Sequence, residues 1–211
     1  QVYQQQVDDT PSDWQQGTLS GVVATAAGDL ELVSNPALSF DGVDDNVSLP
    51  SSVGTLSGDF TIELIVKCSI ITSNILTLIS KNDTSHTINA LPRLWILRIR
   101  DGKVEFGWRL TSGGSWTAVI GNLLVADGKF HRVSVVRNAG TLSIYIDGVL
   151  DVSASVTTAT LGDFTANTYW GRFWNGSAGW LDYYNGLLDD VRIWNVARTQ
   201  QQIQDNMNKE L

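Results

Sequence analysis

The chain has 211 residues and a formal net charge of −8, from 14 lysines and arginines against 22 aspartates and glutamates. A surface of this sign repels a phosphate backbone, so the composition excludes a nucleic-acid partner. The low charged fraction of 17% and the 19 glycines favour one all-β domain with many turns, and the length is enough for a substantial core.

Neither a disulfide framework nor a membrane anchor is expected. Cys68 is the single cysteine, so no internal disulfide can form. No apolar run approaches the roughly 18 residues that a membrane-spanning helix needs, so membrane insertion is not expected.

A polar leader is expected to precede a single domain. Residues 1–13 are rich in glutamine and predict a flexible leader. Short apolar runs at 17–24 and 29–32 predict two short strands, an edge pair that completes a sheet. No repeat and no internal linker is evident in the remainder, so residues 14–211 are expected to form one domain.

Alternation of apolar and polar residues then predicts antiparallel strands. Leu142, Ile144 and Ile146 share one face of an extended segment. Asp-Gly pairs occur at 41–42, 101–102, 127–128 and 147–148. Such a pair suits a type I′ turn, which needs positive φ at both central residues, so tight hairpins are predicted at 99–104 and 145–150.

One short helix is predicted after the last strand. Thr199 and Gln202 form a Thr-x-x-Gln capping box. Ile203, Met207 and Leu211 follow at four-residue spacing, which is typical of an amphipathic helix.

Two segments resemble the first and last signatures of laminin G-like, concanavalin A-like jelly-roll domains. They are ALSFDGVDDNVSL at 37–49 and NGLLDDVRIWNVART at 185–199. Segments 59–64, 128–133 and 141–148 resemble the same family in the same order, and the resemblance covers about residues 37–205. It implies an all-β fold, an antiparallel β-sandwich of jelly-roll type with a short C-terminal helix. It also implies a domain that binds ligands more often than it catalyses reactions.

Acidic residues in these two segments predict a calcium site. Asp41, Asp44 and Asp45 surround a glycine turn. Asp190 lies in the last segment, which the resemblance places beside the first. Calcium prefers carboxylate and carbonyl oxygens, so we expect one structural calcium ion bound by Asp41 and Asp190. A backbone carbonyl near Gly42 and the carboxylate of Asp45 are expected to support it. The alternative is turn chemistry, since aspartate before glycine favours tight turns.

A carbohydrate-binding surface is predicted in the aromatic-rich segment 169–184. A glycine-rich loop over 173–184 is expected to hold large rings at least partly exposed, where sugar rings can stack on them. The candidate residues are Trp174, Trp180, Tyr183, Arg172, Asn175 and Asp182.

A second aromatic cluster is expected around the hairpin at 101–102. Its candidates are Trp95, Trp108, Arg109 and Trp116. Alternatively, the rings of both groups cover the ends of the sandwich, or they form a contact between copies in a homo-oligomer.

The sequence offers no evident catalytic constellation. Retaining glycosidases need two carboxylates about 5 Å apart, and neither Glu63 nor Glu105 is followed by an acidic partner at strand spacing. The only histidines are His86 and His131, and with one cysteine they make no zinc site. His131 and Glu63 are therefore expected to be structural.

These features favour a non-catalytic carbohydrate-binding or adhesion module, stabilised by calcium, whose partner is a glycan or glycoconjugate. Its expected location is extracellular, on a cell surface or on a virion surface. Two alternatives stay open. One is a structural or assembly module, for surface or phage virion decoration or host attachment. The other, less favoured, is a polysaccharide lyase or glycosidase.

Overall fold

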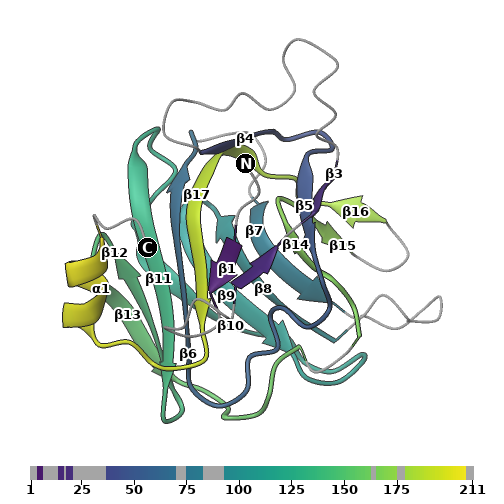
Figure 1. Ribbon diagram of the computed structural model, residues 1–211. Coiled ribbons are helices and arrows are strands. Elements are labelled where there is room, and N and C mark those ends of the chain that lie inside the picture. Colours follow the sequence, from purple (N-terminus) through teal and green to yellow (C-terminus); the bar gives the residue numbers. More distant parts are fainter. Residues whose placement is uncertain are drawn as a thin grey trace.

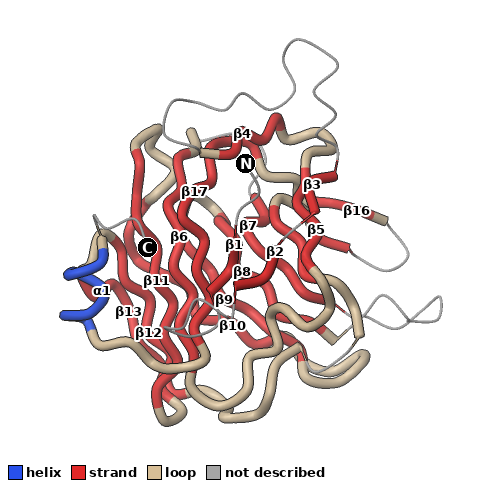
Figure 2. Tube along the Cα trace, viewed as in Figure 1, coloured by secondary structure: helices blue, strands red, loops and turns tan. Residues whose placement is uncertain are grey.

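Two antiparallel sheets stacked face to face form the main body of the protein (Figure 1). The structure is a computed structural model. It describes the strand backbones 4–6, 14–16 and 18–20, and residues 37–69, 75–82, 93–162, 165–174 and 179–207. Among these residues, strands dominate and one short helix lies at the C-terminal end (Figure 2). The predicted β-sandwich with a C-terminal helix is confirmed.

Each sheet combines strands from distant parts of the chain. The seven-stranded sheet has the order β10 (Thr117–Leu124), β9 (Lys103–Arg109), β8 (Leu94–Arg100), β7 (Ile75–Asn82), β14 (Thr168–Trp170), β5 (Asn46–Leu49) and β3 (Thr18–Ser20). The six-stranded sheet has the order β13 (Val149–Ser155), β12 (Thr141–Ile146), β11 (Phe130–Asn138), β6 (Phe60–Lys67), β17 (Asn185–Trp194) and β4 (Leu38–Asp41). Two small ladders pair β1 (Gln4–Gln6) with β2 (Trp14–Gln16) and β15 (Phe173–Trp174) with β16 (Trp180–Leu181).

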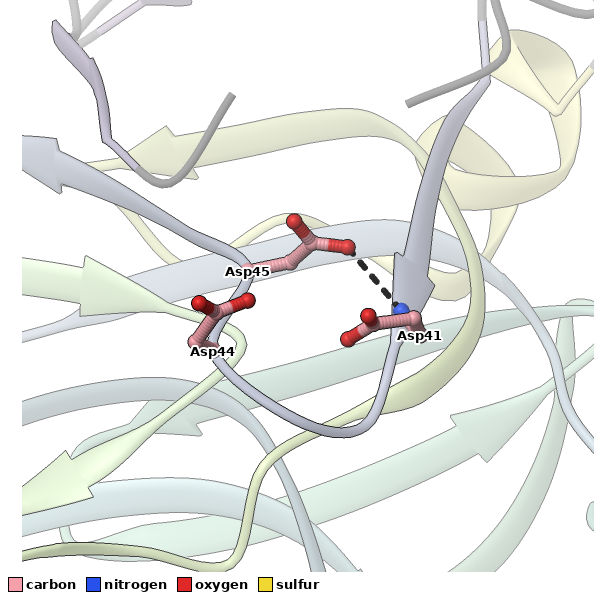
Figure 3. Close-up of side chains that lie close together, drawn as sticks. All are labelled: Asp41, Asp44 and Asp45. Atoms are coloured by element: carbon pink, nitrogen blue, oxygen red, sulfur yellow. Dashed lines mark hydrogen bonds between the residues drawn. The ribbon is translucent and has the colours of Figure 1, made fainter. Parts of the chain in front are cut away.

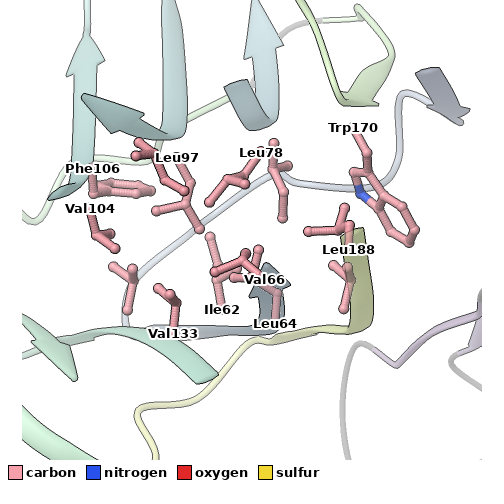
Figure 4. Close-up of a cluster of buried hydrophobic side chains, with 14 of the residues drawn as sticks. Ile62, Leu64, Val66, Leu78, Leu97, Val104, Phe106, Val133, Trp170 and Leu188 are labelled. Atoms are coloured by element: carbon pink, nitrogen blue, oxygen red, sulfur yellow. The ribbon is translucent and has the colours of Figure 1, made fainter. Parts of the chain in front are cut away.

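The core fills the space between the two sheets. Ile62 and Leu64 point from β6 toward Leu97 and Phe106, which project from β8 and β9 (Figure 4). Side chains alternate between the two faces of a strand, so each sheet contributes every second residue to this layer. The residues in between necessarily face outward, and they form the outer faces discussed below.

Both predicted Asp-Gly hairpins are confirmed. Asp101 and Gly102 connect β8 to β9 with φ angles of 50° and 78°. Asp147 and Gly148 connect β12 to β13 with φ angles of 51° and 74°. Positive φ at both central residues is the requirement of a type I′ turn, and glycine and aspartate tolerate it better than bulky residues.

The helix α1 (Gln200–Asn206) is also as predicted. The Thr199 hydroxyl accepts a hydrogen bond from the Gln202 amide, and the Gln202 side chain accepts one from the Thr199 amide. Ile203 is fully buried, whereas Leu211 lies outside the described residues. Arg132 donates to the carbonyl of Met207 at the helix end, where a positive charge is favoured. No helix in the described part of the chain is long and apolar enough to cross a membrane.

The N-terminal part differs from its prediction. Gln4–Gln6, inside the expected flexible leader, forms β1, which pairs with β2 and lies beside β17. Pairing between backbones needs no apolar side chain, so a glutamine-rich composition does not reveal it. β3 does form an edge strand of the seven-stranded sheet, as expected for 17–24. The predicted strand at 29–32 lies outside the described residues.

A buried lysine fastens a loop to one end of the core. The Lys81 ammonium donates hydrogen bonds to the carbonyls of Ser51 and Val53, the latter at 2.7 Å. The Thr168 hydroxyl donates to the same Val53 carbonyl at 2.8 Å. Burial lowers the pKa of Lys81 to about 8, so the side chain is still mainly charged at neutral pH.

Replacing this lysine should destabilise the domain. Lys81→Met leaves two carbonyls without a charged donor, and we expect a loss of about 2–4 kcal/mol in the free energy of unfolding, measured by urea denaturation. Lys129→Met is the control, because the Lys129 side chain is 79% exposed, and it should change stability by less than about 0.5 kcal/mol. Equal stability of the two variants would contradict the role of Lys81.

Candidate functional site

The outer face of the seven-stranded sheet carries the candidate site. Tyr169, Ser80, Ile96 and Gly107 lie opposite one another in register across β14, β7, β8 and β9. Neighbouring strands are about 4.8 Å apart, so this row spans about 14 Å from Tyr169 to Gly107. Half-exposed tryptophans lie over both ends of the row.

An aromatic cluster, formed by Tyr169, Arg172, Trp174 and Trp180, lies at the β14 end. The Trp180 ring makes edge contacts with Tyr169 and Trp174, with centroids 4.6 and 5.2 Å away. The Arg172 guanidinium lies 3.6 Å from the Trp180 centroid and 4.8 Å from the Tyr169 centroid. These contacts fix the rings against one another, and all four side chains remain half-buried.

Two hydrogen bonds attach this cluster to the sheet. The Ser80 hydroxyl donates to the Arg172 carbonyl at 2.7 Å, and the Asn82 amide donates to the Trp174 carbonyl at 3.0 Å. Trp174 and Trp180 lie opposite each other in the ladder of β15 and β16. The predicted partial exposure of these two rings is therefore confirmed. The prediction of a loop over 173–184 is wrong at Phe173–Trp174 and Trp180–Leu181, which pair as the short strands β15 and β16.

Trp116 marks the other end of the row. Its indole lies directly on Gly107, where any Cβ atom would overlap the ring. The Arg98 and Arg109 guanidinium carbons lie 5.1 and 5.8 Å from the Trp116 centroid. Trp116 is half-exposed, so it offers a second, separately supported aromatic surface on the same face.

The other two tryptophans expected in this second cluster belong to the core. Trp95 and Trp108 are 0% and 3% exposed and point between the sheets. They lie opposite each other in β8 and β9, one residue away in the chain from Ile96 and Gly107. Alternation therefore directs them inward, and the expectation that they join a surface cluster is wrong.

A charged layer lies beneath the exposed rings. Arg98 contacts Glu105 at 2.7 Å, and Arg100 contacts the same carboxylate at 3.5 Å. Burial raises the pKa of Asp182, and the positive charge of Arg98 opposes that shift. Glu105 is fully buried, so its charge is neutralised within the protein.

Several polar atoms of this layer lack a hydrogen-bond partner among the described residues. They are Thr77 Oγ1, Asn82 Oδ1, Arg98 Nε and Arg172 Nε. Thr77, Asn82 and Arg98 are at least nine-tenths buried. Burying polar groups without partners is costly, and Glu63, Arg132 and Ser134 of the six-stranded sheet also carry such atoms, so they do not by themselves mark a binding face.

The remaining carbohydrate-site candidates divide into three cases. Burial lowers the pKa of Arg172, and a hydrogen bond with the Tyr183 hydroxyl opposes this shift, so Tyr183 lies beside the aromatic cluster. Asp182 lies toward Arg98, and its carbonyl accepts a hydrogen bond from the Thr77 amide. Asn175 lies outside the described residues. The structure thus brings together most of the candidates and adds Tyr169, which the sequence reasoning had missed because strand pairing places it there.

A second candidate site is the acidic turn between β4 and β5. Oxygens from the carboxylates of Asp41, Asp44 and Asp45 all lie within 4.8 Å of one another (Figure 3). Asp45 accepts a hydrogen bond from the Asp41 amide at 3.0 Å, and Asp41 accepts one from the Val43 amide at 2.7 Å. Gly42, with φ at 83°, makes the turn that lets the acids face each other.

Asp190 does not belong to this turn, and its predicted role there is wrong. β4 and β17 do pair, as the resemblance implied, but the partner of Asp41 is Asn185. Asp190 lies five residues farther along β17, which corresponds to about 16 Å of extended chain. A register shift after Asp189 turns its carboxylate toward Arg132 and Arg192, at 2.7 and 2.6 Å.

The possible acid–base residues occupy structural positions. Burial raises the pKa of Glu63 despite the nearby arginines, and its carboxylate accepts a hydrogen bond from Trp194. His131 lies between Asp147 and Asp127, at 2.8 and 3.1 Å. Burial opposes protonation of the ring, but the two carboxylates outweigh it and raise the pKa of His131. His86 lies outside the described residues.

Comparison with known sequences identifies the family. Residues 41–204 match the family model of the concanavalin A-like lectin/glucanases superfamily, of laminin G type. No curated protein sequence matches the chain.

Solved structures share the same fold at low sequence identity. The binding domain of Paraclostridial Mosquitocidal Protein 1 aligns with a TM-score of 0.67 and 13% identity, covering 98% of this chain and 51% of that one. The receptor binding domain of botulinum neurotoxin D aligns with a TM-score of 0.62 and 13% identity, over 94% of this chain and 50% of that one. This chain therefore spans about half the length of these toxin domains.

A third similar structure has nearly the same length as this chain. It is domain 4 of AbnA, an extracellular arabinanase of family GH43 from Geobacillus stearothermophilus, in complex with arabinotriose. It aligns with a TM-score of 0.64 and 20% identity, over 95% of this chain and 92% of that one.

The surface rings should tolerate truncation far better than the core rings. Trp170→Ala removes a fully buried ring, and we expect a loss of roughly 3–5 kcal/mol in the free energy of unfolding. Trp174→Ala removes a half-exposed ring with one main edge contact, and we expect a loss of about 1 kcal/mol or less. Thermal and urea unfolding measure both. A Trp174 variant as unstable as the Trp170 variant would show that the cluster is part of the core.

Proposed function

Because the chain belongs to the concanavalin A-like lectin/glucanase superfamily, we propose that it is a non-catalytic module that binds a glycan on the outer face of its seven-stranded sheet. The observation that carries this proposal is the aromatic cluster. Trp174 and Trp180 are only half-buried, yet the ladder of β15 and β16 and the hydrogen bond from Asn82 to the Trp174 carbonyl hold them in place. Rings that are fixed before binding lose little entropy when a sugar stacks on them.

The length of the site suits an oligosaccharide. Trp180 at one end and Trp116 at the other lie over a row of about 14 Å whose middle residues, Ser80 and Ile96, are buried. The half-buried carboxylate of Asp182 can accept hydrogen bonds from hydroxyl groups. The similarity to the arabinanase domain, solved with arabinotriose, supports a carbohydrate ligand of this kind. The toxin domains support a binding role more generally.

The geometry argues against hydrolysis at this face. Glu105 is buried and neutralised by Arg98 and Arg100, so it cannot reach a substrate as nucleophile or acid. A glycosidase needs two accessible carboxylates across the scissile bond. Asp182 is half-buried and could be one carboxylate of such a pair. The only carboxylate that the described strands β8 and β9 offer as its partner is Glu105, which is buried.

A second candidate function is an assembly module. The neighbouring edge strands β10 and β13, which belong to different sheets, expose apolar side chains, and Leu123, Leu124 and Val149 are 50%, 55% and 59% exposed. Exposed apolar groups that lie together favour a protein contact. This patch is on different strands from the aromatic cluster, so the two functions can be tested separately. A glycan-binding or assembly role would place the domain outside the cell, on a cell or virion surface.

We propose further that the acidic turn holds a structural calcium ion. Ligand oxygens 2.3–2.6 Å from calcium can be up to about 5 Å apart, and the carboxylates of Asp41, Asp44 and Asp45 satisfy this limit. Asp41 and Asp44 are exposed, so water can supply the ligands that the turn does not. A bound cation would also relieve the repulsion among three carboxylates.

Glycan binding should depend on the aromatic cluster. Screening the domain on a glycan array should identify a ligand that binds with a dissociation constant on the order of 0.1–1 mM, since stacking on one or two rings gives only a few kcal/mol. Trp174→Ala and Trp180→Ala should weaken that ligand at least tenfold in calorimetry. Phe130→Ala is the control, because this 53% exposed ring lies on the other sheet. Unchanged binding in the tryptophan variants, or release of shorter sugars, would refute the proposal.

Calcium should raise the melting temperature of the domain. Binding to the folded state alone adds about 2.7 kcal/mol at a hundredfold excess over the dissociation constant, which shifts the midpoint by several degrees. Asp41→Asn and Asp44→Asn should abolish the shift, whereas Asp205→Asn in α1 should keep it. Scanning calorimetry in calcium and in EDTA measures these effects. Identical melting temperatures for the unmodified chain in both buffers would leave turn chemistry as the explanation of the acidic cluster.

A further inference from the structure

Arg172 contacts no acidic side chain among the residues that the structure describes. Burial lowers the pKa of Arg172, and the groups that act in the other direction are the hydroxyls of Tyr169 and Tyr183, with no carboxylate among them. In the described part of the chain, Arg98 is paired with Glu105, and Arg132 with Asp190. Arg137 also makes no carboxylate contact within the described ranges, but it donates hydrogen bonds to backbone carbonyls such as that of Ala159, whereas Arg172 lies among aromatic rings.

The guanidinium is held where a ligand would lie. It stacks on Trp180 at 3.6 Å and on Tyr169 at 4.8 Å, within the aromatic cluster. Its Nε atom is buried and has no hydrogen-bond partner among the described residues, while the side chain as a whole is half-buried. Stacking and the hydroxyls of Tyr169 and Tyr183 hold the planar guanidinium in one orientation before a ligand binds.

We propose, on the basis of the glycan-binding function inferred above, that this site selects acidic glycans and that Arg172 binds the carboxylate of a uronic acid or related sugar acid. A carboxylate can accept two parallel hydrogen bonds from one guanidinium, which gives both charge neutralisation and orientation. The same sugar ring can then contact the exposed part of the Trp174 or Trp180 ring.

The opposite end of the face favours the same ligand class. Arg109 contacts the Trp116 ring, 5.8 Å from its centroid, about 14 Å along the row from Tyr169. A polymer with acidic groups on successive sugars can therefore meet Arg172 and its rings at one end and positive charge beside the Trp116 ring at the other. A neutral polymer would leave the Arg172 charge partly desolvated and unpaired, which is unfavourable.

The test compares acidic polysaccharides with their own neutral forms. The probes are polygalacturonate, alginate and hyaluronate, each next to its carboxyl-reduced counterpart, with dextran sulfate added to represent sulfate esters. Affinity electrophoresis and calorimetry should show at least one acidic polymer binding about tenfold or more tighter than its reduced form. Raising the salt concentration from about 0.05 to 0.5 M should reduce the ratio of the two affinities, because salt screens the attraction between the partly exposed guanidinium and the sugar carboxylates.

Variants at Arg172 separate charge from geometry. Arg172→Gln should lower affinity for the acidic polymer about tenfold to a hundredfold, as expected for the loss of a charge-assisted pair, and should leave the neutral form nearly unchanged. Arg172→Lys, which keeps the charge but not the planar fork, should fall in between. Lys129→Gln makes the same change in net charge at an exposed position in the connection between β10 and β11, and should bind like the unmodified chain.

The outcomes distinguish this inference from the function on which it rests. Equal binding of acidic and neutral forms, or unchanged selectivity in Arg172→Gln, overturns the acidic preference and leaves glycan binding intact. Binding of dextran sulfate alone overturns the choice of a carboxylate. No binding to any polymer here or on the glycan array refutes both. If Arg172→Gln strongly lowers the melting temperature, the test uses Arg172→Lys instead. Reduced selectivity for the acidic polymer in that variant supports the inference, and unchanged selectivity overturns it.

Discussion

The alternation of side chains along β7, β8 and β9 governs what this domain can present to a ligand. Because Trp95 and Phe106 must face the core, Ile96 and Arg98 must face outward. Strand pairing then aligns the outward positions in rows, and the small residue Gly107 leaves room for an indole to lie flat on the sheet. The strand pairing of the sheet therefore sets the distance between the two aromatic surfaces. The rings are in place before a ligand binds.

Arg172 differs from the paired arginines on the two outer faces of the sandwich. On the six-stranded sheet, Arg132 and Arg192 pair with Asp190, and Arg132 also bonds the end of α1. On the seven-stranded sheet, Arg98 pairs with Glu105, whereas Arg172 stacks on aromatic rings and contacts no carboxylate among the described residues. Burying a charge without a counter-ion is unfavourable for stability alone, so the contacts of Arg172 are the physical basis for assigning ligand recognition to the aromatic cluster.

Local features could be predicted from the sequence, and features that depend on strand register could not. The two Asp-Gly hairpins and the capping box involve neighbouring residues, so their residue types suffice. Asp190 was assigned to the wrong site because a register shift in β17, invisible in the sequence, redirects it. Trp108 was a different error, since its alternation with Phe106 already indicated the core. The contact of Trp116 with Gly107 depends on how β9 and the segment before β10 come together, which no local pattern contains.

Gly171 connects the two candidate sites. It precedes Arg172, has φ at 84°, and packs so closely that a Cβ atom would overlap Phe40 and lie 3.0 Å from the Asp45 carbonyl. Its amide donates a hydrogen bond to the Leu78 carbonyl in β7, and its carbonyl accepts one from the Tyr184 amide just before β17. A cation that orders the acidic turn would therefore also hold the backbone from which Arg172 projects. If both proposals hold, calcium would strengthen glycan binding without contacting the sugar. The entropy cost of ordering that backbone would be met when calcium binds, so the glycan would not have to offset it.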